Sequence, residues 1–214
     1  MTDSYRHKGL RRNLVEEIRS KGIEDERVLD AVLNVPRHYF MDTGFVKYAY
    51  KDQAFPIGCG QTISQPYTVA FQTELLEVEK HCKVLEVGTG SGYQAAILCE
   101  MGAKVFTIER HRDLFIRAQS LLTSMGYKAT FFYGDGYEGK PAYGPFDRIL
   151  VTAGAGEIPE KLKLQMKIGG IMVIPLGDSR CQVMTRIERM AEEEFKVTEH
   201  GRFVFVPLLK GKSG

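Results

Sequence analysis

Apolar residues at helical spacing dominate the first third of the chain. In residues 5–23, YRHKGLRRNLVEEIRSKGI, the positions Leu10, Leu14, Val15 and Ile18 fall on one face of a helix, and Gly22 is a stop signal. Residues 24–35, EDERVLDAVLNV, repeat the pattern and end before a proline. The spacing predicts two amphipathic helices before residue 36.

The periodicity changes at Lys83. From there, short apolar runs typical of buried strands alternate with helical stretches. The strand-like runs are KVLEVG, KVFTIE, ATFFYGDG, FDRILVTAG and IMVIPLG, and the helical ones are GYQAAILCEMG, RDLFIRAQSLLTSMG and IPEKLKLQMKIGG. Residues 181–209 hold two further β-rich runs around the turn-like MAEEEF, which favours a terminal antiparallel hairpin. The predicted fold is α/β and Rossmann-like, a doubly wound, mostly parallel sheet with an N-terminal helical extension and a terminal antiparallel β element.

A glycine-rich segment, PIGCGQTISQPY, joins the two regions. Its glycines permit unusual backbone angles, and Pro66 stiffens the chain and begins a predicted helix, PYTVAFQTELLEV. Ser64 lies just before that helix. On this evidence alone, Ser64 is either an N-cap, which contributes about 1 kcal/mol, or a functional residue.

Composition adds few constraints. The 214 residues are 43% hydrophobic and 26% charged, which predicts one domain over 1–214. The change of periodicity divides it into a helical N-terminal extension, 1–80, and an α/β core, 81–214. A net charge of +2 argues against nucleic acid as a partner. The charged N-terminal stretch and the lack of long apolar runs predict a cytoplasmic protein without membrane contact. The four cysteines show no CxxC pair, so we expect reduced thiols and no metal site.

The loop after the first strand of the predicted sheet is the first candidate site. It reads VLEVGTGSGYQAA, and ligands of such sheets bind at the carboxyl ends of the strands. Gly88, Gly90 and Gly92 allow a sharp turn and bring backbone N–H groups toward a ligand at the start of the next helix. A tight turn without any ligand is the alternative.

Two cofactor classes fit this loop. GxGxxA from Gly90 to Ala95, with Glu109 at the end of the second strand, is an acceptable dinucleotide fingerprint. Glu86, however, places a carboxylate near the position of the phosphates and suits a cationic ligand such as S-adenosylmethionine better. Glu86 has an equally good alternative role, in which it only hydrogen-bonds the loop backbone.

Two later strand ends face the same crevice. Asp135 in YGDGYEG has a carboxylate suited to an adenine amino group, and Gly136 permits close approach of the ring, although Asp-Gly is also an ordinary turn pair. Thr152 in ILVTAGAGEIP either lines the cofactor site or only packs locally.

Taken in order, VLEVGTGSG, TIER, GDG and RILVTAGAGEIP resemble the class I S-adenosylmethionine-dependent methyltransferases. With PIGCGQTISQPYTVAFQTELL upstream and IPLG and FVPLL downstream, the chain resembles the protein-L-isoaspartate (D-aspartate) O-methyltransferase family. The resemblance runs from about Leu10 to Leu209, and its most specific part is the run from Gln61 to Pro66. It implies a seven-stranded methyltransferase sheet with a variant order of its last strands.

The resemblance also implies an activity. The enzyme is expected to methylate the free carboxylate of L-isoaspartyl residues in damaged proteins and peptides with S-adenosylmethionine as cofactor, to act as a monomer, and to start repair through a succinimide. Ser64 matches the family's active-site position. The residues expected to bind the cofactor, from the resemblance and from the strand ends, are Gly58, Cys59, Gly60, Gln61, Glu86, Gly88, Thr89, Gly90, Ser91, Gly92, Glu109, Arg110, Asp135, Gly136 and Thr152.

The chemistry gives Ser64 a specific task. An acceptor carboxylate, with a reference pKa near ~4, is already ionised at neutral pH and needs no general base. We therefore expect the hydroxyl to orient the acceptor and not to act as a nucleophile. A methyltransferase with another acceptor, a dinucleotide oxidoreductase, a non-catalytic binding module and a hydrolase using Cys59 are the alternatives; a merely packed Cys59 is expected.

Overall fold

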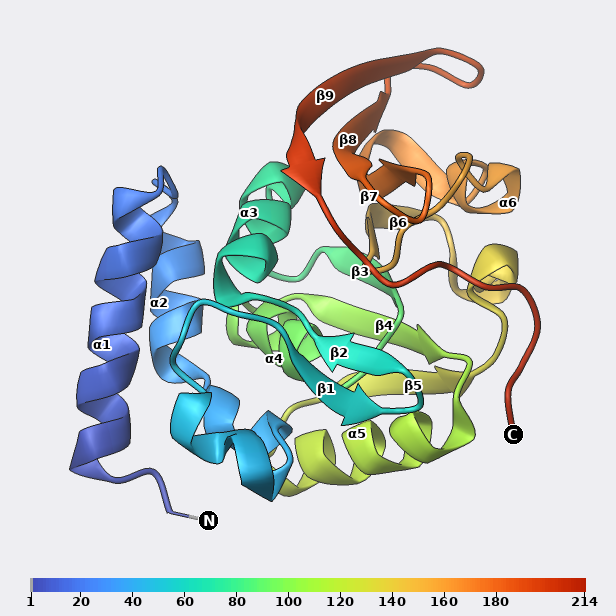
Figure 1. Ribbon diagram of the computed structural model, residues 1–214. Helices are drawn as coiled ribbons and strands as arrows, with labels where there is room; N and C mark the ends of the chain where they lie inside the picture. Colours follow the sequence, from blue (N-terminus) through green and yellow to red (C-terminus); the bar gives the residue numbers. More distant parts are fainter. Residues whose placement is uncertain (1) are drawn as a thin grey trace.

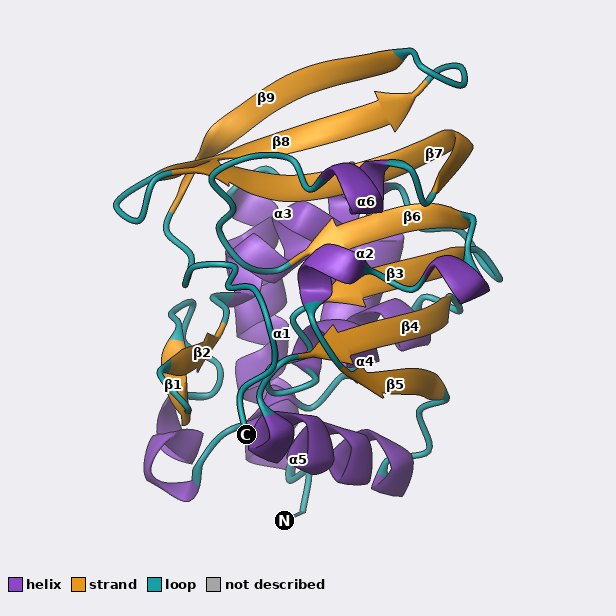
Figure 2. Ribbon diagram, turned by 90° about the vertical axis from the view of Figure 1, so that its right-hand side faces the viewer, coloured by secondary structure: helices purple, strands orange, loops and turns teal. Residues whose placement is uncertain are grey.

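The computed structural model describes residues 2–214 and is built around one seven-stranded sheet (Figure 1). Figure 2 shows its strands side by side in the order β5-β4-β3-β6-β7-β8-β9. The strands are β3 (Lys83–Val87), β4 (Lys104–Glu109), β5 (Ala129–Tyr133), β6 (Phe146–Val151), β7 (Met166–Gly177), β8 (Gln182–Arg189) and β9 (Phe195–Phe203).

Strand direction follows the prediction. The five strands from β5 to β7 pair in parallel, and β8 runs antiparallel to both β7 and β9. The mostly parallel sheet and the terminal antiparallel hairpin are thereby confirmed. The chain switches direction in the sheet between β3, which continues outward to β4 and β5, and β6, which lies on its other side. Such a switch point opens a crevice at the carboxyl ends of the strands.

Two predicted helix signals, the stop at Gly22 and the start at Pro66, are confirmed, and Ser4 is an N-cap that was not predicted. In α1 the Ser4 hydroxyl accepts from the backbone N–H of His7, and Gly22, just beyond the helix, has φ +99°. Pro66 occupies the first turn of α3. The α-helices are α1 (Tyr5–Ser20), α2 (Glu26–Asn34), α3 (Pro66–Leu76), α4 (Tyr93–Glu100), α5 (Arg112–Ser124) and α6 (Glu160–Lys163), and the 3-10 helices are η1 (Arg37–Phe40), η2 (Thr43–Tyr48), η3 (Gly136–Glu138) and η4 (Pro141–Tyr143).

The sheet buries both of its faces. Val84 and Leu85 are adjacent in β3, yet they belong to separate apolar clusters on opposite faces, as the alternation of a strand requires. One cluster includes side chains of α1 to α5, so the N-terminal extension shares its core with the sheet; α1 and α2 lie outside α3 and α4 (Figure 1). The other packs against α6 and the C-terminal segment. No helix within residues 2–214 has the length and apolar character of a membrane span.

The glycine-rich segment forms an element of its own. β1 (Phe55–Gly58) and β2 (Gln61–Ile63) make a small antiparallel hairpin that stands beside the strand ends (Figure 2). Cys59 and Gly60 form its two-residue turn, and both have positive φ, at 52° and 68°. A turn of this type matches the twist of a hairpin and makes Gly60 well suited to its position.

One predicted helix is wrong. Residues 158–170 were expected to be helical, but α6 covers only Glu160–Lys163 and β7 begins at Met166. The backbone N–H of Phe146 donates to Gln165 O at 2.8 Å, and Met166 pairs with Phe146. Pairing with β6 thus overrides a local sequence of good helix formers.

Candidate active site

A cleft lies where the carboxyl ends of β3, β4 and β6 meet the β1–β2 hairpin. Its walls come from distant parts of the chain: the hairpin and the start of α3, the glycine loop, the end of β4, Gly136, residues 152–153 after β6, and residues 206–209. Ten of the residues expected from the sequence line this cleft: Gln61, Ser64, Gly88, Thr89, Gly90, Ser91, Glu109, Arg110, Gly136 and Thr152.

The glycine loop has the backbone that only glycine adopts freely. Gly88, Gly90 and Gly92 have φ of 100°, 53° and 88°. A Cβ on Gly88 would lie 2.4 Å from Thr152 Oγ1, and one on Gly92 would lie 2.3 Å from Leu122 Cδ1. The glycines therefore serve conformation and close packing at once, which a plain turn does not require.

Glu109 fixes this loop to the end of β4. Its two carboxylate oxygens accept from the backbone N–H groups of Gly90 and His111, both at 2.8 Å. Gly88 and Thr89 donate to the Ile108 carbonyl at 2.9 and 3.2 Å. The loop is thus tied to the neighbouring strand by three hydrogen bonds, with the Glu109 carboxylate at the cleft wall.

Glu86 lies under the cleft and does not line it. It is fully buried, its Oε2 accepts from Thr107 Oγ1, and its Oε1 has no hydrogen-bond partner within residues 2–214. Burial raises the pKa of Glu86 to about 8, because the ionised form loses its hydration. Glu86 is therefore protonated at neutral pH, and the expected attraction between its carboxylate and a cationic ligand is not present in this arrangement.

Thr152 and Asp135 have defined local partners. Thr152 Oγ1 donates to the carbonyls of Val87 and Gly88 at 3.0 and 2.7 Å while lining the cleft, so the two roles weighed for it coexist. Asp135 lies beside the cleft, where its carboxylate accepts from the backbone N–H of Tyr137 at 2.9 Å and of Gly211 at 2.6 Å.

The second contact of Asp135 belongs to a C-terminal strap, residues 206–213, that crosses the cleft. The Gly154 N–H donates to Val206 O at 2.8 Å, and Leu208 donates back to Gly154 O at 2.7 Å. Farther along, the Ser213 N–H donates to Arg110 O at 2.8 Å. Sequence analysis missed the strap as a wall of the site, because its carbonyl and amide partners lie some 50 to 100 positions away along the chain.

Ser64 lies between two cavities. It lines the cleft. It also lines a second cavity of about 480 Å³, whose walls include Tyr67, Cys181 and residues 202–206. The two cavities share Thr62, Ser64, Thr152 and Val206. Ser64 is therefore one of the four residues at which the two cavities adjoin.

The N-cap interpretation of Ser64 is wrong. The N-cap of α3 is Gln65, and the Asp52 carboxylate accepts from the Tyr67 N–H at 2.7 Å in the place where a cap would bind. No hydrogen bond among residues 2–214 involves the Ser64 hydroxyl, which leaves it available to a ligand.

Six predicted residues lie outside the cleft lining. Glu86 and Asp135 are placed as described, Gly92 caps α4 behind the loop, and the hairpin tip stands away from the cleft. Gly58, Cys59 and Gly60 form that tip, and Cys59 is exposed, so the expectation of a packed thiol is wrong. Its place in a tight exposed turn gives the side chain nothing to pack against.

Comparison with known proteins adds direct evidence. The family model "Protein-L-isoaspartate(D-aspartate) O-methyltransferase" matches residues 9–213. A protein-L-isoaspartate O-methyltransferase from Cytophaga hutchinsonii is 58% identical over 214 residues, which cover 100% of this chain and 96% of that protein. One from Christiangramia forsetii is 55% identical over 100% of both chains.

The chain belongs to this family. A solved structure from Plasmodium falciparum, assigned to the same family and in complex with S-adenosyl-L-homocysteine, has a TM-score of 0.83, 25% identity, and coverage of 94% of this chain and 99% of that one. Family membership decides against the dinucleotide interpretation of the glycine loop and confirms the resemblance drawn from the sequence.

The cleft of this protein-L-isoaspartate O-methyltransferase family member fits the cofactor its family implies. The positive-φ glycines open a backbone cradle, and Glu109 supplies a carboxylate at the end of β4. Two buried polar atoms on cleft residues, Tyr93 OH and Gln94 Oε1, have no partner within residues 2–214. Buried polar groups are normally hydrogen-bonded, so these atoms suit a polar ligand. Neither residue was singled out from the sequence.

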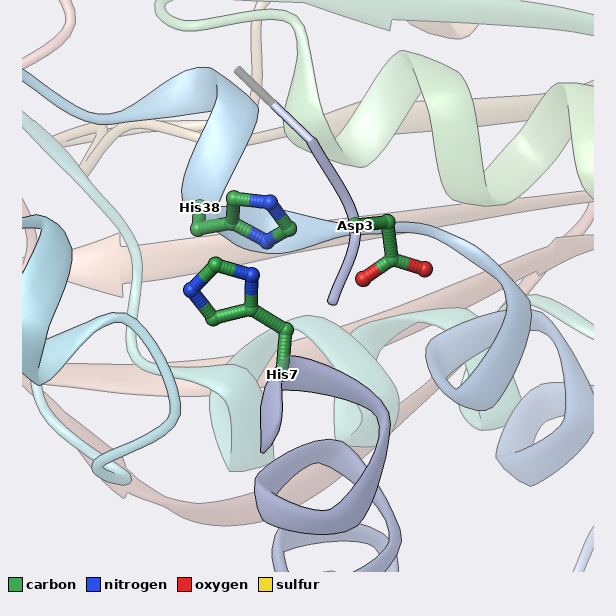
Figure 3. Close-up of side chains that lie close together, drawn as sticks. All are labelled: Asp3, His7 and His38. Atoms are coloured by element: carbon green, nitrogen blue, oxygen red, sulfur yellow. The ribbon is translucent and has the colours of Figure 1, made fainter. Parts of the chain in front are cut away.

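A separate cluster anchors the N-terminal segment of this methyltransferase (Figure 3). Asp3, His7 and His38 bring three potential metal-ligand atoms within 4.8 Å of one another, a grouping the sequence analysis did not expect. Arg11, however, donates to both Asp3 oxygens at 3.1 and 3.0 Å, and His38 Nδ1 pairs with Tyr50 OH at 2.6 Å. The His7 and His38 rings stack at 4.0 Å, so the cluster is a hydrogen-bonded and stacked anchor.

Proposed function

We propose that this protein transfers the methyl group of S-adenosylmethionine to the free carboxylate of L-isoaspartyl residues in proteins and peptides, which starts their repair. The observation that carries the proposal is the position of Ser64 at the junction of the two cavities. In this assignment the glycine-loop cleft binds the cofactor, and the cavity beside Tyr67 and Arg202 binds the acceptor chain. When bound, the cofactor supplies an electrophilic methyl group.

The protein's own residues hold and orient the reactants. The glycine loop, whose Gly88 and Gly90 N–H groups are bonded to the end of β4, would border the cofactor, and the Glu109 carboxylate would bind it as acceptor for ribose hydroxyls. Asp135 stands at the adenine end, where it also holds Gly211 of the strap. The apolar side chains of the strap, Val206 and Leu208, exclude water from the cleft.

Ser64 acts on the acceptor. Its hydroxyl donates to one oxygen of the acceptor carboxylate, which directs the other oxygen toward the cofactor side of the junction. A carboxylate with a reference pKa near ~4 needs no base at neutral pH, so the hydroxyl contributes alignment alone. None of the hydrogen bonds within residues 2–214 pairs Ser64 with a histidine, as a serine nucleophile would require.

The test compares two peptides that differ only in one L-isoaspartyl or L-aspartyl residue. The purified protein is incubated with methyl-labelled S-adenosylmethionine and each peptide, and base-labile methyl ester is counted. Label on the isoaspartyl peptide alone is expected. Equal label on both peptides, or none on either, would contradict the proposal.

We further propose that the protein acts as a cytoplasmic monomer that does not bind nucleic acid. All four cysteines are free thiols, as expected in a reducing compartment, and the net charge is only +2. Sedimentation at micromolar concentration is expected to give the 24.1 kDa mass of one chain.

A further inference from the structure

Arg37 is a fully buried arginine whose guanidinium binds three main-chain carbonyls. Nε donates to Ala49 O at 3.0 Å, Nη2 to Gln53 O at 3.1 Å and Nη1 to Ser64 O at 2.8 Å. None of the ion pairs formed by residues 2–214 includes Arg37. A buried charge is costly unless its hydrogen bonds are satisfied, and here carbonyl oxygens satisfy it instead of a carboxylate.

The charge is retained at neutral pH. Burial lowers the pKa of Arg37, but only to about 10. The guanidinium also lies over the ring of Tyr93, with 5.1 Å between its carbon and the ring centroid. Tyr93 is the first residue of α4 and lines the cofactor cleft. Arg37 therefore contacts the main chain of the acceptor side and a side chain of the cofactor side.

Asp52 holds the residues that directly follow Ser64. Its side chain is 2% exposed and accepts from Lys21 Nζ at 2.6 Å, Gln65 Nε2 at 2.8 Å and the Tyr67 N–H at 2.7 Å. Arg37 fixes the carbonyl of Ser64, and Asp52 fixes the two positions that flank Pro66. The main chain beside the Ser64 hydroxyl is thus clamped on both sides by buried charged groups.

We propose that Arg37 is a positioning residue for methyl transfer, which holds the Ser64 main chain so that the Ser64 hydroxyl meets the acceptor carboxylate. The inference rests on the proposed function and adds a residue to it. Arginine is needed because three acceptors surround one planar, forked donor group, and lysine offers only a single nitrogen. A displacement of about 1 Å at a reacting group can cost ~100-fold in rate, so a looser Ser64 segment should lower kcat.

The test compares Arg37→Lys with wild type and with a matched control. Arg189 also donates to three main-chain carbonyls, those of Ala191, Met166 and Glu192, but it lies at the far end of β8 and outside both cavities. For Arg37→Lys we expect kcat on the isoaspartyl peptide to fall at least about tenfold, with cofactor affinity, measured by calorimetry with S-adenosylhomocysteine, within about twofold of wild type. Hydrogen exchange of residues 61–67 should become faster. Arg189→Lys should leave kcat and that exchange unchanged.

Each outcome is decisive. An Arg37→Lys protein with wild-type kcat, or an equal loss of kcat in Arg189→Lys, would overturn the inference. If wild type itself does not methylate the isoaspartyl peptide, the proposed function fails, while the exchange of residues 61–67 still shows whether Arg37 holds the segment. If Arg37→Lys does not fold, Asp52→Asn replaces it and should give the same separation between kcat and cofactor affinity.

Discussion

The two walls of the cleft are held in different ways. The cofactor wall is a glycine loop whose backbone N–H groups donate to the Ile108 carbonyl and the Glu109 carboxylate at the end of the adjacent strand. The acceptor wall is a hairpin and a turn held by buried side chains, Arg37 and Asp52, that come from the helical extension. One wall is held mainly through main-chain hydrogen bonds to the neighbouring strand, and the other is held by the side chains of two residues.

The buried acids and bases of the two walls differ in the same way. Arg37 has three acceptors and keeps its charge, whereas Glu86, under the cofactor wall, has one donor and an unpaired oxygen and stays protonated. A buried group keeps its charge where the fold supplies enough partners and takes up or releases a proton where it does not.

The largest effect is expected from breaking the cofactor wall with Gly88→Ala. The new Cβ would lie 2.4 Å from Thr152 Oγ1, at φ +100°. Strain of about 1–3 kcal/mol and displacement of the loop should lower the affinity for S-adenosylhomocysteine about 100-fold, as measured by calorimetry. Gly9→Ala is the control, because nothing lies within 4 Å of a Cβ there. Wild-type affinity in Gly88→Ala would show that the loop does not hold the cofactor.

Ser64→Ala should impair the acceptor side of the site and leave the cofactor side unchanged. The loss of one donor to the acceptor carboxylate is expected to lower kcat about 10- to 100-fold, while cofactor affinity stays unchanged. Initial rates at saturating cofactor measure the first quantity and calorimetry the second. Joint loss of both quantities would mean that Ser64 supports the cofactor wall, contrary to its assignment.

Glu86→Gln should remove the contribution of Glu86, which lies under the cofactor cleft, to the pH dependence of the free energy of unfolding. The folded pKa of about 8 lies above the ordinary 4.5, so the folded protein retains a proton that the unfolded chain releases. The stabilising contribution is full below about pH 4.5 and is lost as the pH rises toward 8. Between those limits the wild type should lose up to about 1.4 kcal/mol per pH unit relative to Glu86→Gln, which urea unfolding at pH 5, 6, 7 and 8 would measure.

Wild type and Glu86→Gln share all their other titratable groups, so the effects of those groups on the free energy of unfolding cancel in the difference. His38 is one of them: burial lowers its pKa to about 4, so its contribution is lost as the pH falls below 6.5, in the opposite direction. A constant difference between wild type and Glu86→Gln across the range would contradict the protonated state of Glu86.

The smallest effect is expected at the outer edge of the acceptor cavity. Arg202 is exposed and lines that cavity, so it should attract acidic acceptor chains. Arg202→Glu should raise KM for an acidic isoaspartyl peptide about two- to fivefold, the size of an exposed charge contact, and leave kcat unchanged. The effect should shrink in high salt. Arg12→Glu on α1 makes the same change in net charge outside both cavities, and an equal rise in KM there would refute a local role for Arg202.

The sequence predicted the parts of this molecule that local chemistry determines. The parallel sheet, the helix starts and ten lining residues of the cleft followed from periodicity, glycine spacing and the family resemblance. The helix expected over 158–170 failed because strand pairing overrode local propensity. Arg37, Asp52 and the strap were missed because their partners are distant in sequence. The protonation state of Glu86 was missed because it depends on the degree of burial, which the apolar pattern of a strand does not give. The individual roles of the cofactor-binding residues remain predictions.

The strap has a consequence for how the site is completed and lost. Residues 206–213 follow the last strand, so a chain that stops at Phe203 contains all seven strands but lacks the outer wall of the cleft. Val204, which links β9 to the strap, is 76% exposed. A single proteolytic cut there would leave the strap held by non-covalent contacts alone, its hydrogen bonds to Gly154, Arg110 and Asp135, while every strand of the sheet stays intact. Integrity of the fold and competence of the site are therefore separable, and a folded chain is not by itself a working one.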